Sequence, residues 1–216
     1  MKKFFIILLA VSAAAVLLFF SLEPRLTVAD SSVATTTVTL VVSSEISLSA
    51  SSTIAMSPNI SMSQDTAIGS GNFNVKTNDT AGYTLSLHAS SSPALNNSDN
   101  SFADYTEAVE GTPEAWSVAT GAYEFGFSAY GADVSDATWD SGISSCGSAG
   151  ADSLTTNVKW MGFNGTTPVS GVATKNSETS QAGSDVVLCV AAEQGDSVYA
   201  PSGTYYATIV GTATTQ

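Results

Sequence analysis

An alternation of apolar and hydroxyl-bearing residues, beginning at residue 38, constrains the fold of this chain more than any other feature. Successive side chains of a β-strand point to opposite faces of a sheet, so a period of two predicts half-buried strands. Pro58 and the serine pairs at 43–44 and 51–52 divide the stretch into two or three strands. Most even positions are apolar and odd positions are mostly Thr, Ser, Glu or Asn; the apolar even positions are Val38, Leu40, Val42, Ile46, Leu48, Ala50, Ile54, Met56, Ile60 and Met62.

The same period returns in later segments, which are separated by Gly, Asn, Asp and Ser. The stretch "GNFNVKTNDTAGYTLSLHAS" predicts a hairpin whose turn is "NDTAG". Long loops are expected at 90–114, with a short helix near Phe102–Val109, and at 131–156. No segment sustains a helical period, so the sequence predicts an all-β fold, a single antiparallel β-sandwich of Ig-like or jelly-roll-like type over 38–216. The remaining strands are expected in "AYEFGFSAYG", "NVKWMGF", "DVVLCVAAE" and "GTYYATIVGTA".

The N-terminus differs from the rest of the chain. Two lysines precede an apolar stretch at 4–20, and small residues lead up to Ala29. This pattern predicts a secretory signal peptide over 1–29. The alternative is an uncleaved N-terminal anchor helix that meets the membrane through residues 4–20, whose helical rise of about 25 Å is marginal for a bilayer. Residues 30–37 are small and mostly polar, and they are expected to form a flexible lead-in.

The charge of the chain excludes one class of partner. It has 19 acidic and 6 basic residues, which gives a net charge of −13. A nucleic-acid-binding protein needs a basic surface, so nucleic acids are excluded as partners. Anionic membrane surfaces would repel the chain as well, and its acidity favours solubility.

No arrangement of residues assigns a reaction to this chain. Its one histidine, His88, lies on the polar phase of an expected strand, which favours a surface position over the base of a Ser-His-Asp triad. The loop acids are expected to be solvated, with Ca²⁺ ligation or glycoside hydrolysis as alternatives. We therefore expect no catalytic, cofactor-binding or metal-binding residue. The acids form two groups: Asp99, Asp104, Glu107 and Glu110, then Asp133, Asp136 and Asp140.

The aromatic residues between 116 and 139 fit either a core or a sugar-binding surface. Tyr123, Phe125 and Phe127 share one strand phase, so their burial in the core is expected. Trp139 lies among Asp and Ser in a loop and is the candidate for an exposed, sugar-stacking ring.

The two cysteines, Cys146 and Cys189, are expected to form a disulfide, because two cysteines in an exported chain usually pair. The alternative is two buried free thiols. Cys189 lies on the strand phase opposite to Leu188 and Val190, so it is expected to face away from the main core.

The order of the segments carries a resemblance. The succession of "VTLVV", "ISLS", "FNVKTNDTAGYTLSLHAS", "YEFGFSAYG" and a terminal "SGTYYATIVGTA" resembles secreted bacterial surface proteins of β-sandwich type, over most of 38–216. It is loosely similar to WxL-like cell-surface domains. Trp116-Ser-Val and Trp160-Met-Gly stand where that family has Trp-x-Leu, so the peptidoglycan binding that the family implies is not carried over.

These observations favour a non-enzymatic protein of the bacterial cell surface or the extracellular space, with a structural or adhesive function. A carbohydrate-binding module is the first alternative, and a secreted glycoside hydrolase is the second. The expected partners are a cell-surface protein, a polysaccharide or a second copy of the chain.

The last segment, 201–216, is expected to be an integral closing strand, parallel or adjacent to an early strand such as 38–42 or 45–50. Attachment would then lie at the N-terminal side. The strand expected at 38–42 has two possible partners, its own sheet or the edge of a neighbouring molecule.

Overall fold

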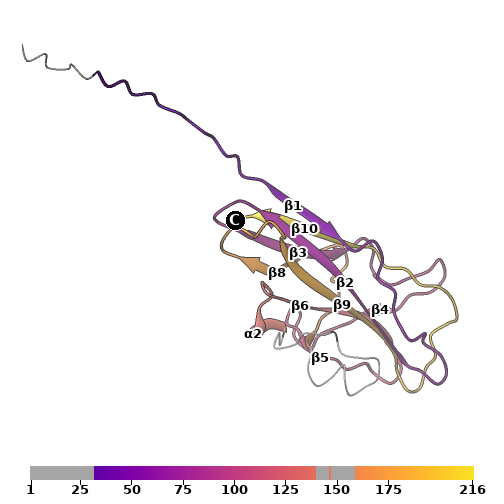
Figure 1. Cartoon of the computed structure of the whole chain (residues 1–216). Helices are drawn as coiled ribbons and strands as arrows, with labels where there is room; N and C mark the ends of the chain where they lie inside the picture. The colour runs from indigo at the N-terminus through magenta and orange to yellow at the C-terminus, as the bar shows by residue number, and fades with distance from the viewer. Residues whose placement is uncertain (1–31, 140–145, 147–158) are drawn as a thin grey trace, which may run out of the picture. The chain divides into compact units, whose positions relative to one another are not determined.

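The structure is a computed structural model that describes residues 32–139, 146 and 159–216 (Figure 1). The expected signal peptide or anchor at 1–29 lies outside these residues. Residues 32–41 form one unit without helix or strand, and residues 42–216 form the folded body. The strand expected at 38–42 does not form. In the described ranges no helix has the length and apolar character needed to cross a bilayer.

The folded body consists of β-strands, which confirms the all-β prediction. All strand pairs are antiparallel except β4 with β6, which run parallel, so the antiparallel expectation is wrong for that pair. The one described helix, α2, is the short Asp136–Trp139. One sheet has five strands in the order β1 (Ile46–Ala50), β2 (Thr66–Thr77), β9 (Ser184–Gln194), β6 (Tyr123–Gly131) and β4 (Ala103–Asp104); a second has β10 (Ile209–Thr215), β3 (Tyr83–Ala89) and β8 (Val169–Lys175); a third pairs β5 (Glu114–Ala115) with β7 (Lys159–Trp160).

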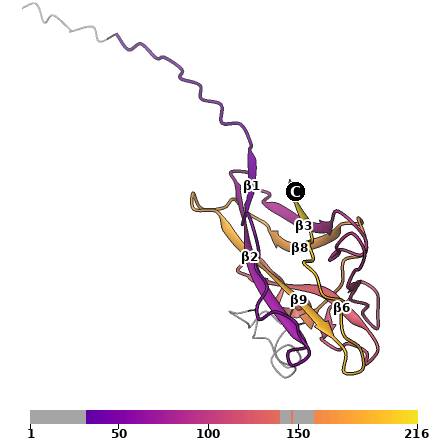
Figure 2. The same ribbon diagram turned by 90° about the vertical axis from the view of Figure 1, so that its right-hand side faces the viewer.

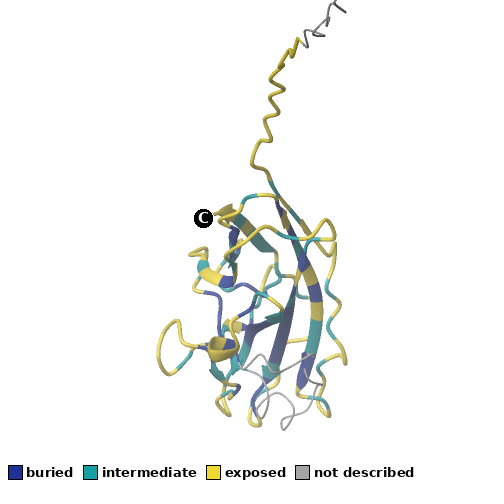
Figure 3. Cartoon of the chain, turned by 60° about the vertical axis from the view of Figure 1, so that its left-hand side comes forward, coloured by how far each residue is buried: buried dark blue, intermediate teal, exposed yellow. Residues whose placement is uncertain are grey.

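The five-stranded and three-stranded sheets share one hydrophobic core. Alternate residues of β3 are fully buried, and the residues between them are half-exposed, as the period of two predicts. Figure 3 shows the same banding of buried and exposed residues along the strands. Each large apolar side chain buried here contributes about 1.5–3 kcal/mol relative to an exposed position. The core includes Phe73 and Val75 of β2, Leu85 and Leu87 of β3, Phe125 and Phe127 of β6, and Leu188 and Val190 of β9.

The expected hairpin at 71–90 is wrong, although both of its strands form. β2 pairs with β1 and β9, whereas β3 pairs with β10 and β8, so the turn at 78–82 carries the chain from one sheet to the other. The apolar side chains of both strands face the same core from opposite sides. Alternation alone cannot separate this arch from a hairpin, because it fixes the buried face of a strand and not its partner.

A second, smaller apolar cluster covers the outer face of the five-stranded sheet. Trp116 lies at its centre, stacked on Tyr105 at 4.6 Å between ring centroids and in edge contact with Trp160 at 5.4 Å. The Cys146–Cys189 disulfide closes this cluster, which confirms the predicted bridge. Cys189 lies on the face of β9 away from the main core, as its strand phase predicts.

Two local expectations for the loops are wrong. Trp139 is only 1% exposed and packs on Phe127 at 5.4 Å between centroids, because α2 turns its ring toward the core. The helix near Phe102–Val109 does not form. Phe102 belongs to the main core and Tyr105 to the outer cluster, and the short strand β4 lies between them. Residues three apart on a helix share one face, so a helix could not have served both clusters.

The C-terminal segment pairs within the fold, as predicted; it hydrogen-bonds to β3 in antiparallel register, and it lies adjacent to the early strand β1 without pairing with it. Figures 1 and 2 show β10 beside β3. β10 also backs closely onto the other sheet, since a Cβ atom on Gly211 would lie 2.6 Å from Phe73 and 3.3 Å from Leu48. The regular strand begins at Ile209, and among the expected strand residues 203–208 Tyr206 forms a bridge, with Asn96.

Candidate binding groove

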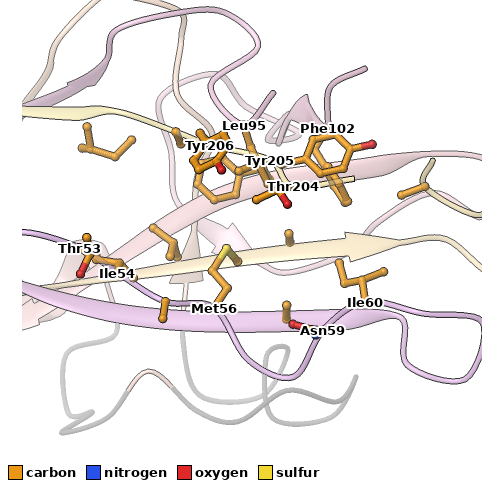
Figure 4. A pocket seen from close by; sticks show the side chains of 18 of the residues that line it. Thr53, Ile54, Met56, Asn59, Ile60, Leu95, Phe102, Thr204, Tyr205 and Tyr206 are labelled. Atoms are coloured by element: carbon orange, nitrogen blue, oxygen red, sulfur yellow. The ribbon is translucent and has the colours of Figure 1, made fainter. Parts of the chain in front are cut away.

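A groove of about 1180 Å³ opens into the core between two segments that are far apart in the sequence. The first wall is the chain that follows β1, residues 50–62, and the second is the chain that leads into β10, residues 199–209. Figure 4 shows the two walls facing each other, with Ile54, Met56 and Ile60 on one side. Inward-facing side chains of β2, β6 and β9 line the groove between the walls.

The first wall exists because the chain leaves β2 for a short distance and then returns. Ser51 donates its N–H to the Asn72 carbonyl at 2.8 Å, and Ser57 does the same to the Ile68 carbonyl at 2.8 Å. Between these points Ile54 covers the inner face of β2. A Cβ atom on Gly71 would lie 2.6 Å from the Ile54 side chain, and one on Gly69 would lie 2.8 Å from it. The two glycines of "IGSG" therefore make room for this wall.

The second wall is held by the loop at 90–102, which follows β3. The backbones of Tyr206 and Asn96 exchange two hydrogen bonds, at 2.8 and 3.0 Å. Tyr205 packs its ring edge on Phe102 at 5.1 Å between centroids, and its hydroxyl donates to the Pro201 carbonyl at 2.7 Å. These contacts order the wall, and residues 199–209 line the groove (Figure 4).

Both ends of the groove are pinned. At one end the buried side chain of Gln194 donates to the Ser61 carbonyl at 2.7 Å and accepts from the Ala200 N–H at 3.0 Å, so one amide joins the two walls. At the other end Gly211 of β10 lies against Phe73 and Leu48. The groove lies between the Gln194 hydrogen bonds at one end and the Gly211 contacts at the other.

The groove contains no charged lining residue, although the chain carries a net charge of −13. Its lining combines apolar side chains with Ser, Thr, Asn, Gln and Tyr. Two rim residues, Tyr199 and Tyr206, are 60% and 70% exposed. Such a surface suits an uncharged ligand with apolar groups and hydrogen-bonding capacity, since a charged group would lose its hydration without gaining an ion partner.

The acids singled out from the sequence do not gather into one site. The Asp104 carboxylate accepts from the Ala94 N–H at 2.8 Å, Glu110 accepts from the Asn164 amide at 2.7 Å, and Glu107 accepts from the Gly162 N–H. Asp99 accepts from the Ser98 hydroxyl, Asp136 begins α2, and Asp140 lies outside the described residues. Within 32–139, 146 and 159–216, no group of three His, Cys, Asp or Glu side chains is placed to hold a metal ion.

The contacts of Asp133 are structural. Its carboxylate accepts hydrogen bonds from the Tyr83 hydroxyl at 2.8 Å and from the Ser184 hydroxyl, and it forms an ion pair with Lys175 at 3.1 Å. Burial raises the pKa of Asp133, but the hydrogen bonds from Ser184, Tyr83 and Lys175 outweigh burial and leave that pKa below its ordinary value. These contacts tie the loop after β6 to β3, β8 and β9.

His88 lies on the outer face of β3, in the middle of the three-stranded sheet, opposite Val210 of β10. It is half-buried on this face. Its Nδ1 atom is buried and has no hydrogen-bond partner among the described residues. His88 does not line the groove.

A pair of carboxylates that the sequence did not single out lies beside the outer cluster. Glu124 of β6 and Glu193 of β9 are cross-strand partners, and the Trp116 indole N–H donates to Glu193 at 2.7 Å. Burial raises the pKa of both carboxyl groups, and the charge of Glu193 raises that of Glu124 further. Neither side chain lines the groove. Only the strand register brings them together, and no motif in the sequence marks it.

Comparisons of this chain with family models, with curated proteins and with solved structures found no match.

Proposed function

We propose that this chain is an exported, non-enzymatic protein of a bacterial cell surface, a single β-sandwich domain that holds an extended, uncharged chain in its groove. Its role is structural or adhesive. The observation that carries this proposal is the uncharged groove between residues 50–62 and 199–209, which opens into the core of an otherwise acidic protein. Apolar surface of this kind on a soluble domain marks a place where another molecule binds.

Two further observations support export. The Cys146–Cys189 bridge belongs to the outer layer of the fold, and disulfides persist in oxidising compartments outside the cytoplasm. The first 29 residues have the composition of a secretory signal. The loop acids support a non-enzymatic role, because Asp104, Glu110 and Asp133 each serve a separate structural contact.

The proposal is tested on whole cells that produce the chain. Met56→Asp places a charge in the first wall of the groove, and Val109→Asp places the same charge on an exposed apolar residue outside it. Intact-mass analysis of the medium and envelope fractions locates each protein. We expect the chain outside the cytoplasm, and we expect Met56→Asp alone to reduce adhesion of the cells to one another or to a surface. An intracellular chain, or equal adhesion of both variants, would refute the proposal.

A neutral carbohydrate is the second candidate ligand, favoured by the exposed rings of Tyr199 and Tyr206 at the groove rim. Aromatic rings with one polar end bind the apolar faces of sugars while their hydroxyls remain solvated. Calorimetric titration with neutral oligosaccharides tests this reading. Binding that is lost in Tyr206→Ala and retained in Val109→Asp would favour the carbohydrate over an extended polypeptide.

A further inference from the structure

The occupant of the groove can be inferred from the edges of the two sheets. β1 is an edge strand of the five-stranded sheet, and β10 is an edge strand of the three-stranded sheet. Leu48 of β1 approaches Gly211 of β10, so the two edges lie on the same side of the core. An edge strand presents N–H and C=O groups that can pair with another strand. The groove begins where these edges separate, at Ala50 and Ile209.

The walls of the groove match the length of a short strand. The part of the second wall that continues β10 is Thr204–Thr208, and its Tyr206 already uses its outward N–H and C=O on Asn96. Where the chain is extended, the N–H and C=O groups of the residues on either side of Tyr206 point away from Asn96. A partner of about five residues, roughly 17 Å long, would cover this wall.

One described segment of this chain has the required composition. Residues 38–42, "VTLVV", alternate with Val38, Leu40 and Val42 on one face, and the chain from 31 to 44 has no charged residue. The segment forms no strand in the structure, and Val38, Leu40 and Val41 are each more than 80% exposed. Exposed β-branched residues in an uncharged, alternating run have a high propensity to pair as a strand.

The contacts of residues 43–45 oppose insertion of this segment into its own groove. The Asn78 side chain accepts from the Glu45 N–H at 2.7 Å and donates to the Ser43 carbonyl at 2.8 Å, and the Ser44 hydroxyl donates to Asp79 at 2.7 Å. These bonds hold residues 43–45 as an extension of β1 on the N-terminal side of Ile46. Folding back along β1 would need a reversal at these three residues and would break all three bonds.

We propose that residues 38–42 of one copy insert as a strand into the groove of a second copy, between the wall at 50–62 and the wall at 199–209. Val38, Leu40 and Val42 fill the groove, and Thr39 and Val41 face outward. This inference rests on the proposed function, and it identifies the extended chain in the groove as residues 38–42 of another copy. Donor segment and acceptor groove are different surfaces, so a head-to-tail contact between successive copies generates a ring or an open chain of subunits.

Sedimentation velocity of the exported protein, purified from the producing cell, tests the proposal. We expect species larger than a monomer that grow with protein concentration. Leu40→Asp should weaken association about a hundredfold, because it would bury an unpaired charge in the groove. Thr39→Asp adds the same charge on the outward phase of the same segment and should associate like the unmodified chain.

A mixing experiment distinguishes head-to-tail insertion from other association. Leu40→Asp keeps an intact groove and Met56→Asp keeps an intact segment, so each alone should be monomeric and the mixture should stop at a heterodimer. Because Met56→Asp can affect folding, a second test avoids the core. A short bismaleimide should join Leu40→Cys in one chain to Tyr206→Cys in another, and should not join it to Val109→Cys.

Each result has one reading. A monomer at every concentration, or assembly that persists in Leu40→Asp, overturns the insertion. If the protein is monomeric while Met56→Asp still abolishes adhesion, the insertion fails and the proposed function stands. If the segment and groove variants lose assembly but keep adhesion, the proposed function fails and the insertion stands.

Discussion

Removal of the Cys146–Cys189 bridge should cost a large part of the stability of the domain. The bridge closes a sequence separation of 43 residues. Cross-linking a loop of that length removes conformational entropy from the unfolded chain worth about 4 kcal/mol. This is a large share of the roughly 5–15 kcal/mol that stabilises a domain.

Packing adds a second contribution that can be measured separately. Cys189 is fully buried and Cys146 nearly so, in the cluster that contains Trp116 and Trp160. Reduction breaks the cross-link and leaves both sulfur atoms in place. The double variant Cys146→Ala/Cys189→Ala also removes the sulfurs, and it should cost a further 1–2 kcal/mol or so through lost contacts.

Equilibrium unfolding in guanidinium chloride distinguishes the two contributions. We compare the oxidised protein, the same protein in excess reductant, and the double alanine variant. The free energy of unfolding should fall by about 4 kcal/mol on reduction, and the slope with denaturant should rise because the unfolded chain expands. A loss below about 1 kcal/mol on reduction would refute the entropic argument, and two labelled thiols in the denatured, unreduced protein would refute the bridge itself.

Three further perturbations probe other parts of the fold. Burial and the nearby charges of Asp65 and Asp196 raise the folded-state pKa of Glu193 above its ordinary value of 4.5. The contribution of Glu193 to stability is therefore greatest below pH 4.5, and it is lost as pH rises through the raised pKa. Glu193→Gln should therefore raise the melting temperature at neutral pH by a few degrees and flatten the pH dependence above 4.5, whereas the exposed Glu178→Gln should do neither. Gly162→Ala would place a methyl group 1.8 Å from the Tyr105 carbonyl oxygen and should cost more than about 3 kcal/mol in chemical denaturation, while Gly121→Ala, which meets no atom within 4 Å, should be nearly neutral. Deletion of 201–216 removes β10 and the second groove wall and should abolish the cooperative melt, whereas deletion of 30–37 should preserve it; a cooperative melt in the first variant would show that the strand is dispensable.

The sequence predicts which residues are buried better than it predicts which strands are neighbours. Alternation places Phe73, Val75, Leu85 and Leu87 in the core, and the structure confirms each of them. The hairpin at 71–90 fails because strand partners depend on long-range pairing, which alternation does not encode. The strand β8 at 169–175 was not expected at all, since "VSGVATK" has a glycine at its third position and no sustained alternation.

The groove could be predicted only in part. Its residues 54, 56 and 60 continue the apolar alternation, and an ordinary paired strand is the natural expectation for them. The structure instead places Ile54 over Gly69 and Gly71, and the chain at 50–62 forms a wall of the groove there. The hydrogen bonds of Gln194 join Ser61 to Ala200, which are far apart in the sequence, so no local pattern predicts them. The disulfide was predictable because only two cysteines are present.

The hydrogen bonds that continue β1 into residues 43–45 also determine how the domain would carry tension. Five consecutive register pairs join β1 to β2 in antiparallel alignment, and the Asn78 side chain extends that zone by gripping Ser43 and Glu45. A pull entering through residue 43 along the strand axis would load these bonds together, in shear, and would not open them one at a time. Rupture under load is governed by the unfolding rate, so this edge would resist a steady pull longer than a strand peeled from its end.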